Sequence, residues 1–170
     1  NFYARTKLMF NDVLKDYAQY YGFSCLHLRL FSSYGPKDNE KLFAYLVKNF
    51  LRKQSIRFPP AERQGNFTYI SDVVDALVRA VDYCLEMGAG YEVFNIGQIQ
   101  AVSIKSIVNI LERQLAISGL VSYDKPYLAN EIFYVNCDGR KARELLGWSA
   151  KIGIEEGLRK TVDYYRSILI

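Results

Sequence analysis

Hydrophobic and polar residues follow two different periods along this chain, and these periods separate predicted helices from predicted strands. Apolar residues recur every three or four positions through residues 1–21, which predicts an amphipathic helix with Gly22 as its stop. The next stretch, 25–30, is short and largely apolar. It lies between Gly22 and the turn-forming residues 32–36, which indicates a buried parallel strand. His27 lies in this strand, and we interpret it as a hydrogen-bonded residue of the sheet rather than as a catalyst.

The middle of the chain repeats this order of helix and strand. Residues 41–53 place apolar side chains on one side of a predicted helix, and two consecutive prolines end the short alternating run that follows. After a strand-like run at 67–70, Ser71 and Asp72 are predicted to cap the next helix at its N-terminus. We interpret Asp72 as a cap and not as a catalyst. The apolar face of this helix is expected to contain Val73, Leu77, Ala80, Val81, Cys84 and Leu85.

The last part of the chain continues with a core strand at 93–97 and a capped helix at 103–116. A short helix capped by Asp138 and a final helix over 154–168 complete the pattern. Trp148, between these two helices, is expected to pack in the core. Helices therefore alternate with short apolar strands, which indicates an α/β fold around a parallel sheet.

The composition is that of an ordinary globular protein. The 170 residues suffice for one domain with a sizeable core; half of them are hydrophobic and 24% are charged. The net charge of +4 comes from dispersed residues, with no basic run that would indicate nucleic-acid binding. No apolar run approaches the ~20 residues of a membrane span, and no signal peptide is visible. Three widely spaced cysteines and one histidine favour a cytoplasmic protein with reduced thiols and without a metal site.

The strand count and the start of the chain indicate that part of the fold lies elsewhere. Only two or three core strands are predicted, fewer than in a doubly wound sheet, and no Gly-x-Gly-x-x-Gly phosphate loop is present. The chain begins with Asn1, and its helical pattern is already running at residue 3. We therefore expect the C-terminal part of a longer protein.

Tyr3 and Lys7 carry the strongest candidate chemistry. They are four residues apart in the first predicted helix, so the phenol and the ammonium share one face. A nearby cation favours the phenolate form of a phenol, which makes Tyr3 a candidate proton donor or acceptor near neutral pH. Such spacings also arise by chance, so an ordinary surface pair is the alternative from these two residues alone.

Five stretches resemble one protein family in their order and spacing. They are Tyr3-x-x-x-Lys7, Arg29-Leu-Phe-Ser-Ser-Tyr34-Gly35-Pro36, Asn66-Phe67-Thr-Tyr69-Ile-Ser-Asp72-Val73-Val74-Asp75-Ala76, Phe94-Asn95-Ile96-Gly97, and Leu145-Leu146-Gly147-Trp148 followed by Glu155-Glu156-Gly157-Leu158. Together they are similar to the C-terminal half of the NAD-dependent nucleotide-sugar epimerases and dehydratases, which are extended short-chain dehydrogenases/reductases. Each motif is weak alone, but five in register favour the catalytic interpretation of the Tyr–Lys pair.

The resemblance implies part of a Rossmann-type parallel sheet and a small mixed α/β substrate-binding lobe. Residues 1–35 and 64–97 would complete the sheet, and residues 36–63 and 98–170 would build the lobe. The Gly-rich, NAD-binding N-terminal half of the family would be absent from this chain.

The resemblance also implies a mechanism and a set of site residues. Tyr3 would take a proton from a sugar hydroxyl while hydride passes to the nicotinamide of NAD or NADP, with Lys7 lowering the proton affinity of the phenol. Lys7 would also hydrogen-bond the nicotinamide ribose. Leu30, Phe31 and Ser32 would contact the cofactor, and the substrate would be a nucleotide sugar.

The chain departs from the family at three places that bind phosphate. The family commonly has Asn where Ser32 stands, Arg-Asp-Phe where Gly65-Asn66-Phe67 stand, and an Arg near Glu131-Ile-Phe-Tyr-Val135. A diphosphate prefers bidentate, cationic partners, so we expect a rearranged substrate site. Its candidate residues are Ser32, Lys41, Arg63, Asn66 and Tyr134.

Several functions stay open at this point. The intact protein would be an epimerase (an isomerase) or a dehydratase (a lyase), with a 4-keto reductase as an alternative. It would otherwise be a non-catalytic dinucleotide-binding regulator, although the intact Tyr–Lys pair argues against this. The chain alone would be an inactive fragment with exposed apolar faces. The resemblance further implies a homodimer that uses the helix of the Tyr–Lys pair.

Overall fold

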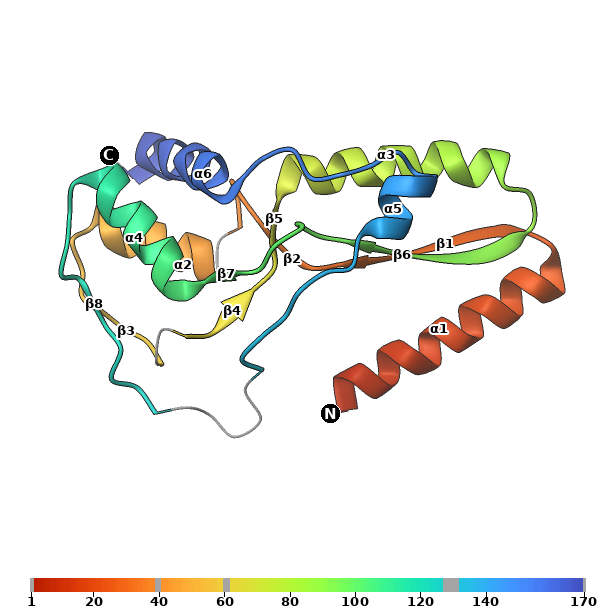
Figure 1. Ribbon diagram of the computed structural model, residues 1–170, viewed down its shortest axis with the longest axis horizontal. Helices are drawn as coiled ribbons and strands as arrows, with labels where there is room; N and C mark the ends of the chain where they lie inside the picture. The colour runs from red at the N-terminus through yellow and green to blue at the C-terminus, as the bar shows by residue number, and fades with distance from the viewer. Residues whose placement is uncertain (1, 39–40, 60–61, 127–131, 170) are drawn as a thin grey trace.

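The computed structural model describes residues 2–38, 41–59, 62–126 and 132–169, and Figure 1 shows their arrangement. Helices and short strands alternate along the chain, as the hydrophobic pattern predicts. The elements are α1 (Phe2–Tyr21), β1 (Ser24–Leu30), β2 (Ser32–Tyr34), α2 (Leu42–Leu51), β3 (Ile56–Arg57), β4 (Gln64–Gly65), β5 (Phe67–Tyr69), α3 (Ile70–Glu86), β6 (Gly90–Ile96), β7 (Val102–Ser103), α4 (Ile104–Leu115), β8 (Val121–Ser122), α5 (Arg140–Leu145) and α6 (Ile154–Leu169).

One half of the molecule, here called the sheet unit, consists of α1, β1, α3, β6 and α5. Its two strands pair in parallel, from Ser24 opposite Gly90 to Leu30 opposite Ile96. In Figure 1, α1 lies on one side of this pair, and α3 and α5 lie on the other. The chain enters β1 through Gly22, whose positive φ of 68° ends α1 as predicted.

The other half, here called the lobe, contains α2, α4, α6 and the remaining short strands. The strand β2 pairs with β5 and β3 with β8, both in parallel, whereas β4 and β7 are antiparallel. Ser103 caps α4 as predicted, because its hydroxyl accepts a hydrogen bond from the Ser106 backbone N–H at 3.0 Å. The lobe is joined to the sheet unit where β1 leads into β2 and where β5 leads into α3 (Figure 1).

Each half has its own hydrophobic core. The lobe buries side chains of α2, α4 and α6 together with Tyr34 and Tyr69. The sheet unit buries Phe94 and Ile96 of β6 against small residues of α3 and against Trp148. Trp148 is 2% exposed, which confirms the expected core packing. Helix α5 and Trp148, which lie within 98–170, pack on the sheet unit.

The start of α3 differs from the prediction. The helix begins at Ile70 with Tyr69 as its N-cap, so the prediction that Ser71 or Asp72 caps it is wrong. The carboxylate of Asp72 instead accepts hydrogen bonds from the backbone N–H groups of Lys151 at 3.0 Å and Ile152 at 2.9 Å. An aspartate near a predicted helix start can accept hydrogen bonds from the first turn of that helix or from a distant segment, and the sequence does not distinguish the two cases. Asp72 thus joins the two halves of the molecule.

The apolar side chains of α1 and α3 are only partly covered. Val73 and Ala80 are buried as predicted, but Leu77, Val81 and Leu85 are exposed, so the expected buried face of α3 is wrong at these three residues. A sheet of two strands covers one row of apolar side chains on α3 and leaves the neighbouring row exposed to solvent. On α1, Leu8, Met9, Phe10, Val13 and Tyr17 are likewise exposed. Within the described residues, no helix combines the length and apolarity needed to cross a membrane.

Candidate active site

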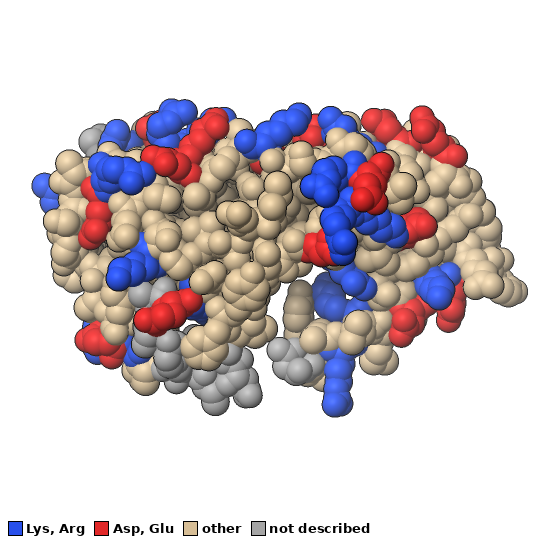
Figure 2. Space-filling model, in the orientation of Figure 1, with Lys and Arg blue, Asp and Glu red and all other residues tan. Residues whose placement is uncertain are grey.

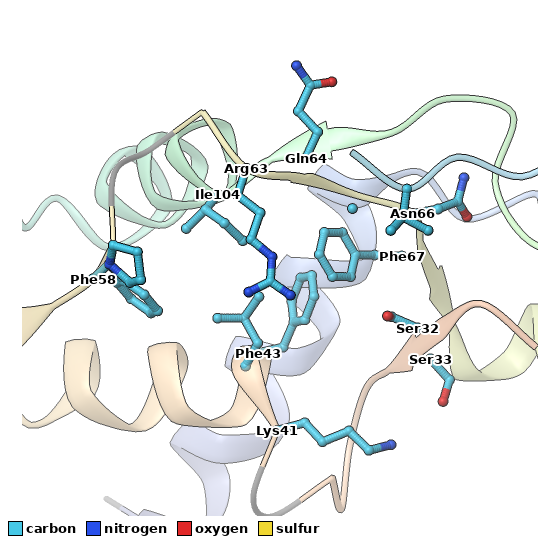
Figure 3. A pocket seen from close by; sticks show the side chains of 14 residues that line it. Ser32, Ser33, Lys41, Phe43, Phe58, Arg63, Gln64, Asn66, Phe67 and Ile104 are labelled. Atoms are coloured by element: carbon cyan, nitrogen blue, oxygen red, sulfur yellow. The ribbon is translucent and has the colours of Figure 1, made fainter. Parts of the chain in front are cut away.

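A cavity of about 290 Å³ opens in the lobe next to the junction with the sheet unit. Its walls come from β2, α2, β4, β5 and the start of α4, which are far apart in the sequence. Figure 3 shows the side chains around it. The lining residues are Ser32, Ser33, Lys41, Leu42, Phe43, Phe58, Pro59, Arg63, Gln64, Gly65, Asn66, Phe67, Ile104 and Val135.

Four of the five predicted substrate-binding residues, Ser32, Lys41, Arg63 and Asn66, line this one cavity. In Figure 3 the guanidinium of Arg63 points into the space beside Phe43 and Phe67, and the hydroxyl of Ser32 faces the same space from β2. The ammonium of Lys41 lies 3.8 Å from a carboxylate oxygen of Asp38 and is largely exposed. The structure thus places two cations and a hydroxyl at one opening, a set suited to an anionic, hydrogen-bonding ligand.

Asn66 differs from the other three because it is 1% exposed and hydrogen-bonded to the protein. Its Nδ2 donates to the backbone oxygen of Gln98 at 2.8 Å and to Oδ1 of Asn136 at 3.0 Å. Its Oδ1 accepts from the backbone N–H of Gln98 at 2.8 Å. These bonds hold the wall of the cavity between β5 and the segment after β6. Substrate binding by Asn66 itself stays a prediction.

Tyr134 lies outside the lining of the cavity. It forms a parallel β-bridge with Gln64, and its side chain is exposed. Its neighbour Val135 lines the cavity instead. Glu131, part of the same departure from the family pattern, lies outside the described residues.

The cavity has an aromatic wall that the sequence pattern did not predict. Phe43, Phe58 and Phe67 line it, and the rings of Phe43 and Phe67 meet edge to face with centroids 5.0 Å apart. Phe43 also stacks on Tyr34, with centroids 4.0 Å apart, which ties the wall to the lobe core. The helical period of residues 41–53 identifies Phe43 only as an apolar residue. Nothing in that period shows that the core side of α2 also forms a pocket wall.

Tyr3 and Lys7 lie on one face of α1, as predicted, and outside the lining of this cavity. The Lys7 ammonium is 5.5 Å from the centroid of the Tyr3 ring, within the range of a cation–π contact. The tyrosine side chain is 68% exposed. In Figure 1, α1 runs antiparallel to β1, so its first turns lie at the end of the sheet unit where β1 and β6 finish. Open α/β sheets bind their ligands at this end.

The residues around the end of β1 suit the nicotinamide end of a dinucleotide. Leu30 offers a half-exposed apolar side chain, the backbone N–H of Phe31 bonds the oxygen of Ile96 at 3.0 Å, and the exposed Ser32 connects this end to the cavity. Lys7 and Arg29 both act on His27, whose pKa is lowered first by burial and then by these two cations. The hydroxyl of Ser32 and the positive charge of Lys7 and Arg29 suit a ribose or a phosphate. The Gly-rich loop needed for the cofactor's own diphosphate is absent from the chain.

The chain is similar to known proteins over most of its length. The model of the NAD dependent epimerase/dehydratase family matches residues 1–97. A UDP-glucuronate 4-epimerase of Thermodesulfobacterium geofontis is 29% identical over 165 residues, covering 95% of this chain and 49% of that protein. UDP-glucuronate 4-epimerase 4 of Arabidopsis thaliana is 28% identical over 179 residues, covering 97% of this chain and 41% of that protein. The chain thus spans about half the length of the curated relatives it matches.

Solved structures show the same relationship in three dimensions. The UDP-glucose 4-epimerase of Thermotoga maritima, crystallised with UDP-glucose, is 28% identical with a TM-score of 0.82, covering 94% of this chain and 52% of that one. The UDP-glucuronic acid 4-epimerase of Bacillus cereus, crystallised with UDP-glucuronic acid and NAD, is 29% identical with a TM-score of 0.75, covering 83% and 45%. These likenesses confirm the predicted Rossmann-type α/β fold. The chain belongs to the NAD-dependent epimerase/dehydratase family.

Proposed function

We propose that the intact protein is an NAD-dependent UDP-sugar 4-epimerase, and that this chain supplies its acid–base pair and most of its sugar-nucleotide site. The observation that carries the proposal is the gathering of Ser32, Lys41 and Arg63 around one aromatic-walled cavity that adjoins the end of β1. The Tyr3–Lys7 pair stands at the same end of the sheet unit. The 4-epimerase relatives and structures support the reaction type.

Tyr3 is proposed to act as the proton acceptor and donor. It would accept the proton of the sugar 4-hydroxyl as that carbon is oxidised, and return it after the 4-keto sugar has presented its other face. NAD, when bound, would supply a reversible hydride acceptor for that carbon, so the overall reaction would be redox-neutral. Lys7, whose ammonium lies 5.5 Å from the centroid of the Tyr3 ring, would hydrogen-bond the ribose of the nicotinamide.

The cavity is proposed to hold the nucleotide end of the substrate. Its volume is at the lower end of the range for ligand pockets, so the sugar would extend out of it toward α1. Phe43, Phe58 and Phe67 offer aromatic surface to a base, and Arg63 and Lys41 offer charge to the diphosphate. Arg63 would thereby replace the phosphate-binding arginine that the family commonly has at position 65.

The uncovered surfaces of the sheet unit support the view that the intact protein contains more of the sheet. Among the described residues, β1 pairs with β6 alone, so its other edge is available to a further strand. The apolar side chains of α1 are also exposed. We propose that a dinucleotide-binding half pairs with β1, and that α1 contributes to a homodimer of the intact protein.

Replacing Tyr3 by Phe in the intact protein tests the acid–base role. With UDP-glucose and UDP-glucuronate as substrates, Tyr3→Phe is expected to lower kcat about 10²- to 10⁴-fold, because general acid–base catalysis contributes on that order. NAD binding, measured by calorimetry, should persist. Tyr20→Phe, which alters an exposed tyrosine of the same helix, serves as the matched control and should retain wild-type turnover. Wild-type kcat in Tyr3→Phe with both substrates would refute the proposal.

Replacing Arg63 tests the assignment of the cavity. Arg63→Ala removes a charge-assisted partner worth about 1.5–3 kcal/mol, so KM for the UDP-sugar should rise about 10- to 100-fold. Arg63→Lys should recover part of this loss, because the charge stays but the bidentate fork is gone. Arg57→Ala is the control, since Arg57 pairs with Asp124 at 3.0 Å and does not line the cavity. Equal KM values for Arg63→Ala and Arg57→Ala would contradict the assignment.

A further inference from the structure

The attachment of α1 to the rest of the molecule depends on little buried surface. Ala18 is the buried residue of this 20-residue helix, and its larger apolar side chains, including Met9 and Val13, are exposed. Hydrophobic burial therefore fixes the orientation of α1 less firmly than it fixes α2, which buries five of its ten residues. Hydrogen bonds between α1 and the sheet therefore contribute more to fixing the orientation of this helix.

Such bonds converge on the side chain of Asn11. Its Oδ1 accepts a hydrogen bond from the hydroxyl of Tyr91 on β6 and lies 2.5 Å from Nδ1 of His27 on β1. An amide oxygen can only accept, so His27 donates from Nδ1. The hydroxyl of Tyr91 is also 3.1 Å from His27 Nδ1, which closes a three-residue cluster. Asn11 therefore binds both strands of the sheet unit through one oxygen atom.

Asn11 also continues the face that carries the proposed catalytic pair. Tyr3, Lys7 and Asn11 follow one another at intervals of four residues within α1, so all three project from one side of the helix. At 1.5 Å per residue, Asn11 is about 6 Å along the axis from Lys7 and about 12 Å from Tyr3. A tilt of about 5° around Asn11 would displace Tyr3 by about 1 Å, and a misplacement of that size can cost about 10²-fold in rate.

We propose that Asn11 is a positioning residue for the Tyr3–Lys7 pair: by tying α1 to His27 of β1 and Tyr91 of β6, it sets the direction in which the helix presents the phenol. The inference rests on the proposed function for its kinetic consequence. The tie itself is a property of the chain and can be tested without catalysis.

The first test measures hydrogen exchange in the intact protein. Asn11→Ala should speed amide exchange in α1 about 10-fold or more and leave α4 unchanged. Alanine has the higher intrinsic helix propensity, so faster exchange would report the lost tie and not a weaker helix. Asn11→Asp, which keeps an accepting oxygen at the same place, should exchange like wild type. Asn49→Ala on α2 is the control, because Asn49 bonds within its own helix, to the oxygen of Tyr45. Unchanged α1 exchange in Asn11→Ala would overturn the inference.

The second test separates positioning from binding by steady-state kinetics with UDP-sugar. Asn11→Ala should lower kcat about 10- to 100-fold and change KM less than about 3-fold, because the misplaced group acts in the chemical step. Asn11→Asp should restore kcat to within about 3-fold of wild type. If Tyr3→Phe abolishes turnover while Asn11→Ala keeps wild-type kcat, positioning fails and the proposed function stands. If Tyr3→Phe itself keeps turnover, the proposed function fails, and the exchange experiment still decides whether Asn11 ties α1.

Discussion

The lobe and the sheet unit differ in how they use hydrophobic residues. Among the described residues, the lobe gathers fifteen buried ones into one core around α2, α4 and α6, whereas the sheet unit gathers seven. The helices of the sheet unit leave Leu8, Met9, Leu77 and Val81 exposed. Apolar area removed from water is the main favourable term in folding, so the lobe is stabilised by its own residues and the sheet unit much less so.

This difference indicates which interactions hold each half of the molecule in place. The lobe forms a ligand cavity with walls that are part of a packed core, as Phe43 shows. The sheet unit presents its candidate catalytic pair on a helix held by hydrogen bonds, with apolar faces that remain available to other parts of an intact protein. The proposed active site would therefore combine rigid cavity walls in the lobe with an incompletely packed helix in the sheet unit.

The largest effect is expected from Gly157→Ala in α6. A Cβ atom at this position would lie 2.0 Å from the hydroxyl oxygen of Tyr34, whose ring is stacked on Phe43 in the lobe core. The core cannot open without losing packing, so we expect the free energy of unfolding to fall by about 3 kcal/mol or more in urea denaturation.

Gly153→Ala is the matched control for this change. A Cβ atom at Gly153 would have no heavy atom within 4 Å among its described surroundings, so its effect should stay within about 0.5 kcal/mol. Combining Gly157→Ala with Tyr34→Phe removes the hydroxyl in closest contact and should recover part of the loss. Similar stabilities for the two glycine variants would show that the lobe core is looser than the structure indicates.

The second effect concerns the joint between the two halves. Asp72→Ala removes the acceptor for the N–H groups of Lys151 and Ile152, at a side chain that is 5% exposed. Leaving buried donors unpaired costs about 1–3 kcal/mol, so we expect a loss of about 2–3 kcal/mol by thermal or urea unfolding. Asp75→Ala on the same helix is the control. It breaks a part-exposed ion pair with Arg79 and should cost about 0.5 kcal/mol at most. Equal losses would deny that Asp72 joins the halves.

The smallest effect is a pH dependence in the sheet unit. Burial, followed by the charges of Arg29 and Lys7, lowers the pKa of His27 below its ordinary value of about 6.5. The unfolded chain thus binds the proton more readily, so this contribution to stability is complete above pH ~6.5 and is lost as the pH falls through that value toward the lower folded pKa.

Urea denaturation between pH 7.5 and 5.5 measures this dependence. His27 is the single histidine of the chain, so the decline in unfolding free energy should disappear in His27→Gln. An unchanged slope in that variant would assign the dependence to other groups. Because His27 lies on β1, the same titration would destabilise the sheet unit before the lobe.

Several elements were predictable from the sequence because they depend on neighbouring residues alone. The helical period and Gly22 predict α1 and its end, and the apolar run at 25–30 predicts β1. The spacing of Tyr3 and Lys7 predicts their common face. The motif at 66–76 contributes to the family resemblance, and it does not show that Asp72 bonds Lys151 and Ile152 across the molecule.

The sequence by itself determined the α/β class, the family and the residue types available for an acid–base pair and an anion site. Only the tertiary structure decided that Ser32, Lys41 and Arg63 surround one cavity, that Phe43 forms its wall, and that Asn11 ties α1 to both strands. The physical reason is that periodicity records the polarity of side chains along one element. Contacts between distant elements depend on how all of them pack together. The hydrophobic period of α1 therefore does not show that a polar residue such as Asn11 bonds two distant strands.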